Sequence, residues 1–453
     1  MPTFLEKNKV FIKNLLILAV PIILQNLIGA SVNLLDNIMI GSLGENEIAA
    51  TGIANQYYMV FFNTANGFIM GAGIFMSQYW GKRDIKSIHK FIGISLVFST
   101  GMAILFAIGA VVFSDNIMHL FTKDSVVTAL GRDYLVTVTL SYIFTTISLS
   151  FGMALRSVGF TKIPMYGSLI GLVFNGILNY IFIFGKLGIS PLGVTGAALG
   201  TTVARFMEMS FILVTIYIVQ KNMVAGKIRE IMSFNLSLIK RFLITATPVV
   251  FNDIMWTVGF TTYFVIYSRL GTNATATMQI CSTVNNAFNI FGIGIAVAAS
   301  ILIGNQIGAD EIDKVKESAM KISIFGIVLG VVIGIFFFIT APYVTLIFKI
   351  TEETKRHVIQ VLRVMSVVLP LRFYGIVQII GVLRGGGDVM YAIGTELIGV
   401  WCIGVPLSYL GVEYFNVSIT IVYALTCLEE VFKVIATTPR LLSGKWIKSL
   451  VKE

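Results

Sequence analysis

The residues best suited to chemistry in this sequence are one carboxylate and a few neutral oxygen-bearing side chains. Asp36 lies toward the end of the first hydrophobic stretch. Asn175 and Asn179 are four residues apart, so they project from one face of a helix. Thr201 and Thr202 follow a run of Gly and Ala that permits close approach to a neighbouring helix. These groups would form an oxygen-rich site for a monovalent cation, or a carboxyl that burial keeps ready to bind a proton. A solvated aspartate at the membrane interface is the alternative, since the sequence alone does not bring the three segments together.

A second group of ionisable residues lies within hydrophobic stretches of the C-terminal half. A charge at the centre of a membrane helix costs at least about 2.5–3.5 kcal/mol, so each such residue needs a partner or a function. The residues that we group as a candidate C-terminal site are Asp253, Arg372, Glu396 and Glu430, with Glu429 and Lys433 nearby. Two interpretations stay open: a buried ion-pair cluster that fixes packing, and a second site for a proton or a cationic substrate.

Other arrangements of reactive side chains favour structure over chemistry. Arg205 and Glu208 are three residues apart, which predicts an ion pair within one helix. The three Cys residues stand singly in apolar runs and the three His residues are far apart, so we expect no metal site and no catalytic site. The net charge of +10 has no basic block outside short loops, which argues against nucleic acid as a partner.

These side chains must be positioned by membrane-spanning helices. Hydrophobic types make up 56% of the 453 residues and charged types only 12%, about half the share in soluble domains. The composition predicts an all-α polytopic membrane protein, because lipid requires every backbone polar group to be satisfied internally. The expected transmembrane helices, twelve in number, cover approximately 14–36, 52–78, 91–113, 134–155, 164–185, 194–219, 241–267, 279–304, 320–342, 359–382, 390–411 and 416–438.

The chain also repeats itself. A shift of 227 residues places Pro21 on Pro248 and Leu43-Gly44 on Leu270-Gly271. The shift becomes 228 further on, where Leu155-Arg156 meets Leu383-Arg384. We therefore predict two six-helix lobes, residues 1–226 and 227–453. Six is an even number, so both lobes have the same orientation and are related by a pseudo-two-fold axis along the membrane normal. Such repeats place a substrate cavity between lobes and suit rocking motions.

The basic residues predict the orientation. Most of the 33 Lys and Arg residues fall on the side that holds both termini, which places the termini in the cytoplasm. The N-terminal segment enters the first span without a small-residue cleavage site, so we expect a retained helix in the cell (inner) membrane.

Several motifs, taken in order, resemble the multidrug and toxic compound extrusion (MATE) family of bacterial type. They are the helix-1 pattern from Pro21 to Asp36, the Ser77-Gln78…Gly81-Lys82…Asp84 ending of helix 2 with its counterpart Gly304 to Gly308, the Leu155-Arg156 and Leu383-Arg384-Gly385 turns, and Ser443-Gly444-Lys445-Trp446. The resemblance implies an antiporter that exports organic, often cationic compounds. It also implies a coupling site at Asp36, Asn175, Asn179 and Thr201, with Thr202 adjacent. Many members carry Asp where this chain has Asn179, which leaves the choice between Na⁺ and H⁺ open.

The expected mechanism joins these features. Na⁺ or H⁺ neutralises Asp36, helix 1 bends at Pro21, and the rocking lobes release the organic substrate. We expect a monomer that uses no cofactor besides the coupling ion and has no enzymatic activity. The alternative function is a flippase for a lipid-linked precursor, which would favour a more basic cavity than these spans offer.

Overall fold

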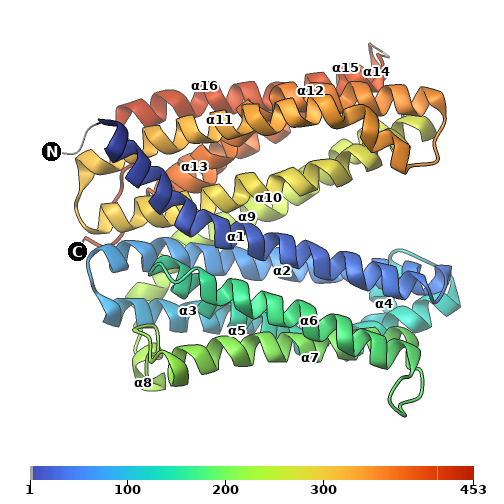
Figure 1. The fold of residues 1–453 in the computed structure, drawn as a ribbon, viewed down its shortest axis with the longest axis horizontal. Helices are drawn as coiled ribbons and strands as arrows, with labels where there is room; N and C mark the ends of the chain where they lie inside the picture. Colours follow the sequence, from blue (N-terminus) through green and yellow to red (C-terminus); the bar gives the residue numbers. More distant parts are fainter. Residues whose placement is uncertain (1–3, 416, 453) are drawn as a thin grey trace. The chain divides into compact units, whose positions relative to one another are not determined.

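The structure is a computed structural model that describes residues 4–415 and 417–452 of the chain. Every regular element among these residues is a helix (Figure 1). Internal contacts divide the chain into two compact units. We call Val20–Val250 the N-unit, and the described residues up to Ala19 together with those from Phe251 onward the C-unit. The predicted lobes at 1–226 and 227–453 rest on the repeat rather than on contacts, and stay a prediction.

The N-unit is built from long helices, and capping residues mark where some of them start. Asp84 caps the third helix by accepting a hydrogen bond from the Ser87 N–H at 3.1 Å, and Asp124 caps the fifth through Val126 N–H at 2.8 Å. These acids therefore stabilise helix starts. The helices are α1 (Phe4–Gly41), whose first part belongs to the C-unit, α2 (Glu45–Gly81), α3 (Ile85–Val112), α4 (Ser114–His119), α5 (Ser125–Ser157), α6 (Lys162–Phe184), α7 (Gly193–Val214) with a π-helical end η1 (Thr215–Val219), and α8 (Ile228–Ile231).

The C-unit contains more interruptions of its helices. Its elements are α9 (Leu236–Ser268), which begins in the N-unit, α10 (Thr272–Gly308), α11 (Ile312–Val344), η2 (Thr345–Ile347), α12 (Glu352–Ile376), η3 (Val377–Arg384), α13 (Val389–Leu397), η4 (Ile398–Gly404), α14 (Val405–Glu413), α15 (Ile419–Thr426) and α16 (Leu428–Ser443). Of these, η3 and η4 are π-helical segments, a form that often occurs at functional sites.

Eleven helices of the described chain are long and apolar enough to cross a membrane. They correspond to the first eleven predicted spans. The predicted twelfth span, 416–438, differs: it is divided at Cys427 into α15 and α16, and residue 416 lies outside the described residues. The break places the N-terminus of α16, with the positive end of its dipole, beside Glu429 and Glu430. Hydropathy measures composition, so it could not locate this break.

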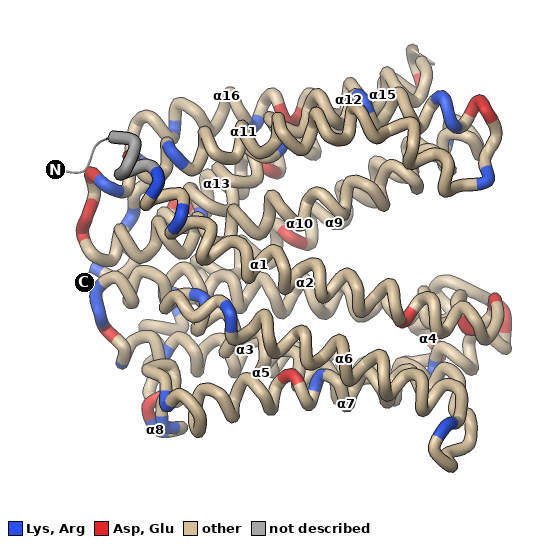
Figure 2. The backbone as a smooth tube through the Cα atoms, viewed as in Figure 1, with Lys and Arg blue, Asp and Glu red and all other residues tan. Residues whose placement is uncertain are grey.

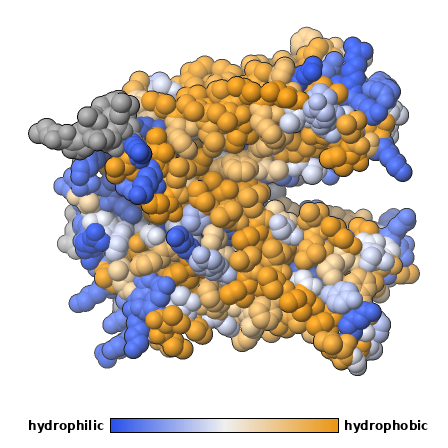
Figure 3. All heavy atoms as spheres, in the orientation of Figure 1, coloured by the Kyte–Doolittle hydropathy of each residue, from blue (hydrophilic) through white to orange (hydrophobic). Residues whose placement is uncertain are grey.

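In each unit, charged and hydrophilic residues lie near the helix ends, and apolar residues occupy the middle of the helices. Most charged residues lie near helix ends, and few lie in the middle of the helices (Figure 2). Hydrophobic side chains cover much of the visible surface of both units, with hydrophilic ones gathered at the ends (Figure 3). This distribution is the one that lipid around the helices requires, and it confirms the all-α polytopic fold class.

The two repeat-related prolines lie close to the points where the chain passes between units. Pro21 follows Ala19 by two residues inside the 38-residue helix α1, and Pro248 precedes Phe251 by three inside α9. A proline within a helix has no N–H to donate, which allows the helix to bend there. Both passages between units therefore occur next to a bendable point.

Candidate functional site

The structure brings together four of the five side chains that the sequence analysis assigned to the coupling site, Asp36 included. Asn179 donates from Nδ2 to Asp36 Oδ1 at 2.5 Å and lies 3.4 Å from Asn175 Oδ1. Asn175 in turn donates from Nδ2 to Thr201 Oγ1 at 3.3 Å. This row, which we call the N-site, runs from α1 through α6 to α7. The sequence alone did not show that these three helices are neighbours, and the structure shows that they meet at these residues.

Small residues on α7 make the N-site compact. A Cβ at Gly196 would lie 2.6 Å from the Phe182 carbonyl oxygen, and a Cβ at Gly200 would lie 2.2 Å from Asn179 Oδ1. Both distances are shorter than real Cβ contacts, so only glycine allows α7 to approach α6 this closely. The Gly- and Ala-rich run has the role that its composition predicted.

The fifth predicted residue, Thr202, lies beside the N-site and points away from it. Its hydroxyl donates to the backbone carbonyls of Ala198 at 2.8 Å and Thr137 at 3.4 Å, so it joins α7 to α5. Consecutive helical residues differ by about 100° in direction, which explains why Thr201 and Thr202 do not share one set of contacts.

The N-site offers oxygen atoms, and Arg205, a cation that acts on Asp36 electrostatically, forms no ion pair with it. Asp36 forms no ion pair with a Lys or Arg residue in the described part of the chain. Asn179 is fully buried, and its Oδ1 accepts no hydrogen bond from any described group. Carboxylate, amide carbonyl and hydroxyl oxygens are the ligands that hard cations prefer. The site can therefore hold a proton on Asp36 or a hard cation among these oxygens.

A second buried row in the N-unit escaped the sequence analysis as a whole, although its Arg205–Glu208 pair was predicted. Arg156 donates to Gln25 Oε1 at 2.6 Å, and Gln25 donates to Ser168 Oγ at 3.0 Å. Ser168 donates to Glu208 Oε1 at 2.7 Å, and Arg205 pairs with Glu208 Oε2 at 2.8 Å. We call this row the Arg156 chain. The repeat match of Arg156 to Arg384 was the signal that could have marked it.

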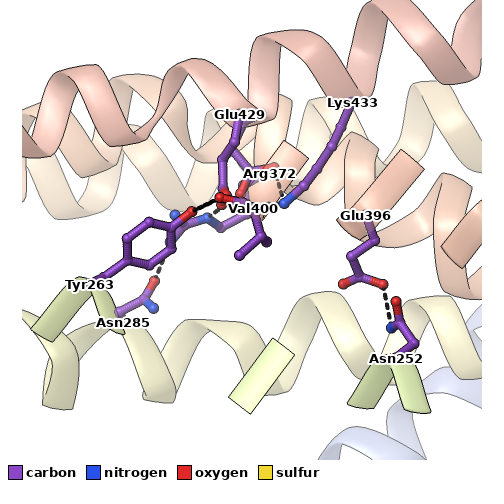
Figure 4. A network of polar contacts seen from close by, with 9 residues as sticks. Asn252, Tyr263, Asn285, Arg372, Glu396, Val400, Glu429 and Lys433 are labelled. Atoms are coloured by element: carbon purple, nitrogen blue, oxygen red, sulfur yellow. Dashed lines mark hydrogen bonds and ion pairs between the residues drawn. The ribbon is translucent and has the colours of Figure 1, made fainter. Parts of the chain in front are cut away.

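The four residues of the candidate C-terminal site separate into two clusters. In the first, the Arg384 cluster, Arg384 lies 3.4 Å from Asp253 Oδ1 and 3.2 Å from Glu396 Oε2. Asn252 donates to the same Glu396 oxygen at 2.8 Å (Figure 4). The end of η3 supplies the arginine and α13, just before η4, supplies the glutamate. Sequence reasoning had treated Arg384 as a loop residue, because a basic residue beside three glycines resembles a cytoplasmic turn.

The second cluster, the Glu430 cluster, holds the other two predicted residues. Arg372 lies 3.1 Å from Glu430 Oε1 and donates to Asn285 Oδ1 at 2.7 Å. Figure 4 shows Glu429 and Lys433 on the same side of α16, facing Arg372 and Tyr263. The remaining contacts are Lys433 Nζ to Glu429 at 3.3 Å and to Glu430 at 3.6 Å, and Tyr263 Oη donating to Glu429 at 2.6 Å.

The two C-unit clusters differ in their balance of charge. The Glu430 cluster has two carboxylates and two cations, of which Arg372 is partly buried and the other three are buried, and the N-terminus of α16 further stabilises the carboxylates. The Glu430 cluster therefore fits the first of the two interpretations, an ion-pair cluster that fixes packing. The Arg384 cluster has two carboxylates and one cation, so its charges do not balance.

The geometry defines a class of protein. The described residues hold eleven apolar membrane-length helices, a partly buried carboxylate without an ion-pair partner and further ionic clusters inside the helices, which is the architecture of a polytopic membrane protein with polar sites inside its spans. The sequence model of the MatE family matches residues 21–181 and 248–410, once in each half at starting points 227 residues apart. The chain belongs to the MATE family, a family of small-molecule transporters.

Relatives and solved structures agree with this assignment. The chain is 25% identical over 414 residues to a probable multidrug resistance protein NorM of Halalkalibacterium halodurans, covering 90% of this chain and 88% of the relative. It is 23% identical to a probable NorM of Thermotoga maritima, over 97% and 94% of the two chains. A MATE crystal structure in complex with MaL6 has a TM-score of 0.87 at 19% identity, over 96% and 97%. A MOP superfamily transporter from Pyrococcus furiosus has a TM-score of 0.86 at 20% identity, over 97% of each chain.

Proposed function

We propose that this chain is a secondary antiporter that exports organic, often cationic and amphipathic compounds in exchange for Na⁺ or H⁺, with Asp36 as the coupling carboxylate. The observation that carries the proposal is a partly buried carboxylate whose described partners are all neutral. A charge removed from water without a counter-charge is costly, and binding a cation relieves that cost. Asp36 is therefore the group in the N-unit most responsive to an arriving ion.

The N-site also supplies what either ion needs. A proton would convert Asp36 into a neutral acid that still accepts the Asn179 hydrogen bond. A sodium ion would find the Asp36 carboxylate, the unpartnered Asn179 carbonyl oxygen and the Thr201 hydroxyl on three neighbouring helices. A bound proton would neutralise Asp36, and a bound sodium ion would offset its charge. Either ion would therefore change the attraction between Asp36 on α1 and the amides of α6.

Movement of α1 at Pro21 is the second part of the proposal. Pro21 and Asp36 lie on the same helix, and the helix changes unit between Ala19 and Val20. A change in the attraction between Asp36 and the α6 amides would be transmitted along α1 to its bendable point. Rocking of the two repeated lobes, which the repeat favours, would then expose the substrate to the outside.

The remaining features of the proposal concern place and energy. We propose that the protein works as a monomer in the cell membrane with both termini in the cytoplasm, because most basic residues lie on that side. One cation crossing about 100 mV supplies ~2.3 kcal/mol, which sustains roughly a 50-fold gradient of a neutral substrate at ~1.4 kcal/mol per decade.

The test is export of a fluorescent organic cation from liposomes that contain the purified protein. Efflux is measured under an imposed Na⁺ gradient and, separately, under an imposed pH gradient, for the natural chain and for Asp36→Asn. We expect one gradient to drive efflux and the substitution to abolish that response, because an amide can neither bind a proton nor supply a negative ligand. Asp133→Asn, an exposed acid beside Arg132 outside the N-site, is the matched control and should leave efflux unchanged.

Two results would contradict the proposal. Undiminished efflux by Asp36→Asn at equal protein content would remove this residue from coupling. Efflux that neither gradient drives, together with scrambling of a polyprenyl-phosphate lipid probe, would instead favour the flippase alternative.

A further inference from the structure

An apolar groove runs between three helices of the C-unit. α12 packs against both α11 and α16, so α12 forms the floor of the groove and the other two helices form its walls (Figure 1). The groove has a volume of about 270 Å³. Its apolar lining includes Met320, Ile324, Ile327, Leu371, Val434 and Leu442. Ile324 and Leu442 stay 54% and 66% exposed, so the groove is open to whatever surrounds the C-unit.

The polar side chains that border this groove are satisfied within the protein. Gln378 donates to Ser323 Oγ. Tyr374 Oη lies 2.7 Å from Thr438 Oγ1, and Thr438 donates to the Val434 carbonyl at 2.7 Å. Sites for small organic ligands usually present a few polar groups that orient the ligand. This groove offers apolar contact instead, which suits a hydrocarbon chain.

Two lysines lie at one end of the groove. Lys316 precedes Met320 by one turn of α11, so both side chains project from the same face of the helix. Lys445 follows the last turn of α16. The two segments meet here, because the Lys316 Cε lies 3.1 Å from the place of a Cβ at Gly444, the residue before Lys445. Both lysines are exposed, so a ligand in the groove can reach them.

Neither lysine has a counter-charge. Lys316 and Lys445 form no ion pair with any side chain that the structure describes, whereas the nearby Lys321 pairs with Glu317 at 2.6 Å. Asp313, one turn earlier on α11, is not within ion-pair distance of Lys316 among these residues. The end of the groove therefore carries two positive charges that an anionic ligand would complement.

We propose that the groove binds one anionic phospholipid, with an acyl chain along α11, α12 and α16 and the phosphate between Lys316 and Lys445. Met320 and Ile327 are seven residues apart, about 10 Å along the helix, so the chain would run from the membrane surface into the hydrocarbon region. Apolar contact alone gives little preference in a bilayer, because lipid tails are equally apolar. The lysines supply the preference, since basic pockets between helices bind anionic head groups.

The test is native mass spectrometry of the delipidated full-length protein in detergent. The protein is titrated with palmitoyl-oleoyl-phosphatidylglycerol and, separately, with the phosphatidylcholine that has the same chains. We expect one phosphatidylglycerol molecule to bind about 25-fold more tightly than phosphatidylcholine, about fivefold for each lysine. No substrate or ion gradient is present, so the result does not depend on antiport.

Matched variants separate the head-group contact from the chain contact. Lys316→Gln and Lys445→Gln should each weaken phosphatidylglycerol binding about fivefold, and together they should remove the preference over phosphatidylcholine. Lys349→Gln, an exposed lysine between η2 and α12 at the opposite end of α11, is the control and should change nothing.

A second pair of variants tests the groove itself. Ile327→Trp fills it and should weaken binding of both lipids at least tenfold, whereas Ile335→Trp, exposed on α11 outside the groove, should not. The lysine variants change exposed side chains, so they decide the question even where Ile327→Trp does not fold.

Three outcomes would overturn the proposal. Equal binding of the two lipids, unchanged by the lysine variants, would indicate ordinary contact with membrane lipid. Competition by free glycerol 3-phosphate as strong as by the whole lipid would indicate a phosphate site without a chain. A dimer of the natural chain that Ile327→Trp dissociates would assign the groove to a contact between two copies.

Discussion

The two units place different chemistry at equivalent positions of one repeated scaffold. Asp36 of the N-site corresponds, at the offset of 227, to Tyr263 of the Glu430 cluster. Asp36 is a carboxylate held by neutral amides, whereas Tyr263 is a neutral hydroxyl that donates to Glu429. The same helical position thus presents the acceptor in one unit and the donor in the other.

The two equivalent arginines, Arg156 and Arg384, also have different partners in the two units. Arg156 reaches Gln25, and Arg384 reaches the acids beside Asn252, the residue equivalent to Gln25. In the N-unit, compensation comes from a more distant acid, Glu208, through Ser168. The comparison shows that the two units share the proline and glycine positions and the arginine. They differ in the acids and neutral groups that surround that arginine.

The largest effect should come from removing the arginine where it stands alone against two acids. Arg384→Ala leaves two partly buried carboxylates without their ion-pair partner, and we expect it to lower the free energy of unfolding by up to about 3–5 kcal/mol, the cost of breaking a fully buried pair. Arg156→Ala should cost less, about 1.5–3 kcal/mol, because Glu208 keeps its pair with Arg205. Unfolding of the purified proteins, followed by tryptophan fluorescence in detergent, measures both changes.

A charge-compensated variant checks the cause. The triple variant Arg384→Ala, Asp253→Asn, Glu396→Gln removes all three charges and should recover part of the lost stability. If the triple variant were as unstable as Arg384→Ala, lost packing of the arginine stem would be the main cause and the proposed asymmetry would lose its energetic support.

The next largest effect concerns the position equivalent to Asp36. Tyr263→Phe deletes the hydroxyl that donates to Glu429 at 2.6 Å and retains the ring. Hydrogen bonds to charged groups contribute about 1.5–3 kcal/mol, and we expect a loss of stability in this range. Tyr57→Phe is the matched control, because its hydroxyl donates to the neutral Phe106 carbonyl at 2.8 Å and should cost only about 0.5–1.5 kcal/mol. Equal losses for the two variants would contradict the charge-assisted role of Tyr263.

The sequence predicted more of the scaffold than of the polar contacts, for a physical reason. Hydropathy and the repeat located the spans because apolar length and Pro or Gly punctuation are local properties. Asn175 and Asn179 could be placed on one face of a helix for the same reason. The partition of Asp253 and Arg372 into different clusters depends on which helices meet at which depth, and no local pattern records that.

The repeat itself contained information that residue types did not. Matching Arg156 to Arg384 identified two equivalent arginines, yet both sit beside Gly-containing turns and looked like cytoplasmic anchors. Arg384 is buried at the π-helical end of η3, whereas Arg156, near the end of α5, is partly buried. Tyr263 gave no signal at all, because a lone tyrosine in an apolar helix is ordinary.

A smaller effect on stability, with a clear effect on coupling, should follow from filling the space beside Asn179. Gly200→Ala places a methyl group 2.2 Å from Asn179 Oδ1, so the amide or α7 must shift. Overpacking of this kind costs about 1–3 kcal/mol, and a displaced Asn179 would loosen its bond to Asp36. We expect weaker gradient-driven efflux from liposomes. Gly101→Ala has open space around it and serves as the control. Full coupling in Gly200→Ala would show that the N-site tolerates a displaced Asn179.

The smallest expected change in stability separates two adjacent threonines. Thr201→Val and Thr202→Val each remove one hydroxyl and keep the branched shape, and each should cost about 0.5–1.5 kcal/mol. Only Thr201 bonds a residue of the N-site, whereas Thr202 bonds backbone carbonyls of α7 and α5. Thr201→Val should therefore raise the ion concentration needed for half-maximal efflux, and Thr202→Val should leave it unchanged. The opposite ranking would mean that the oxygen facing the coupling ion is supplied by Thr202, and that α7 turns relative to α6 during transport.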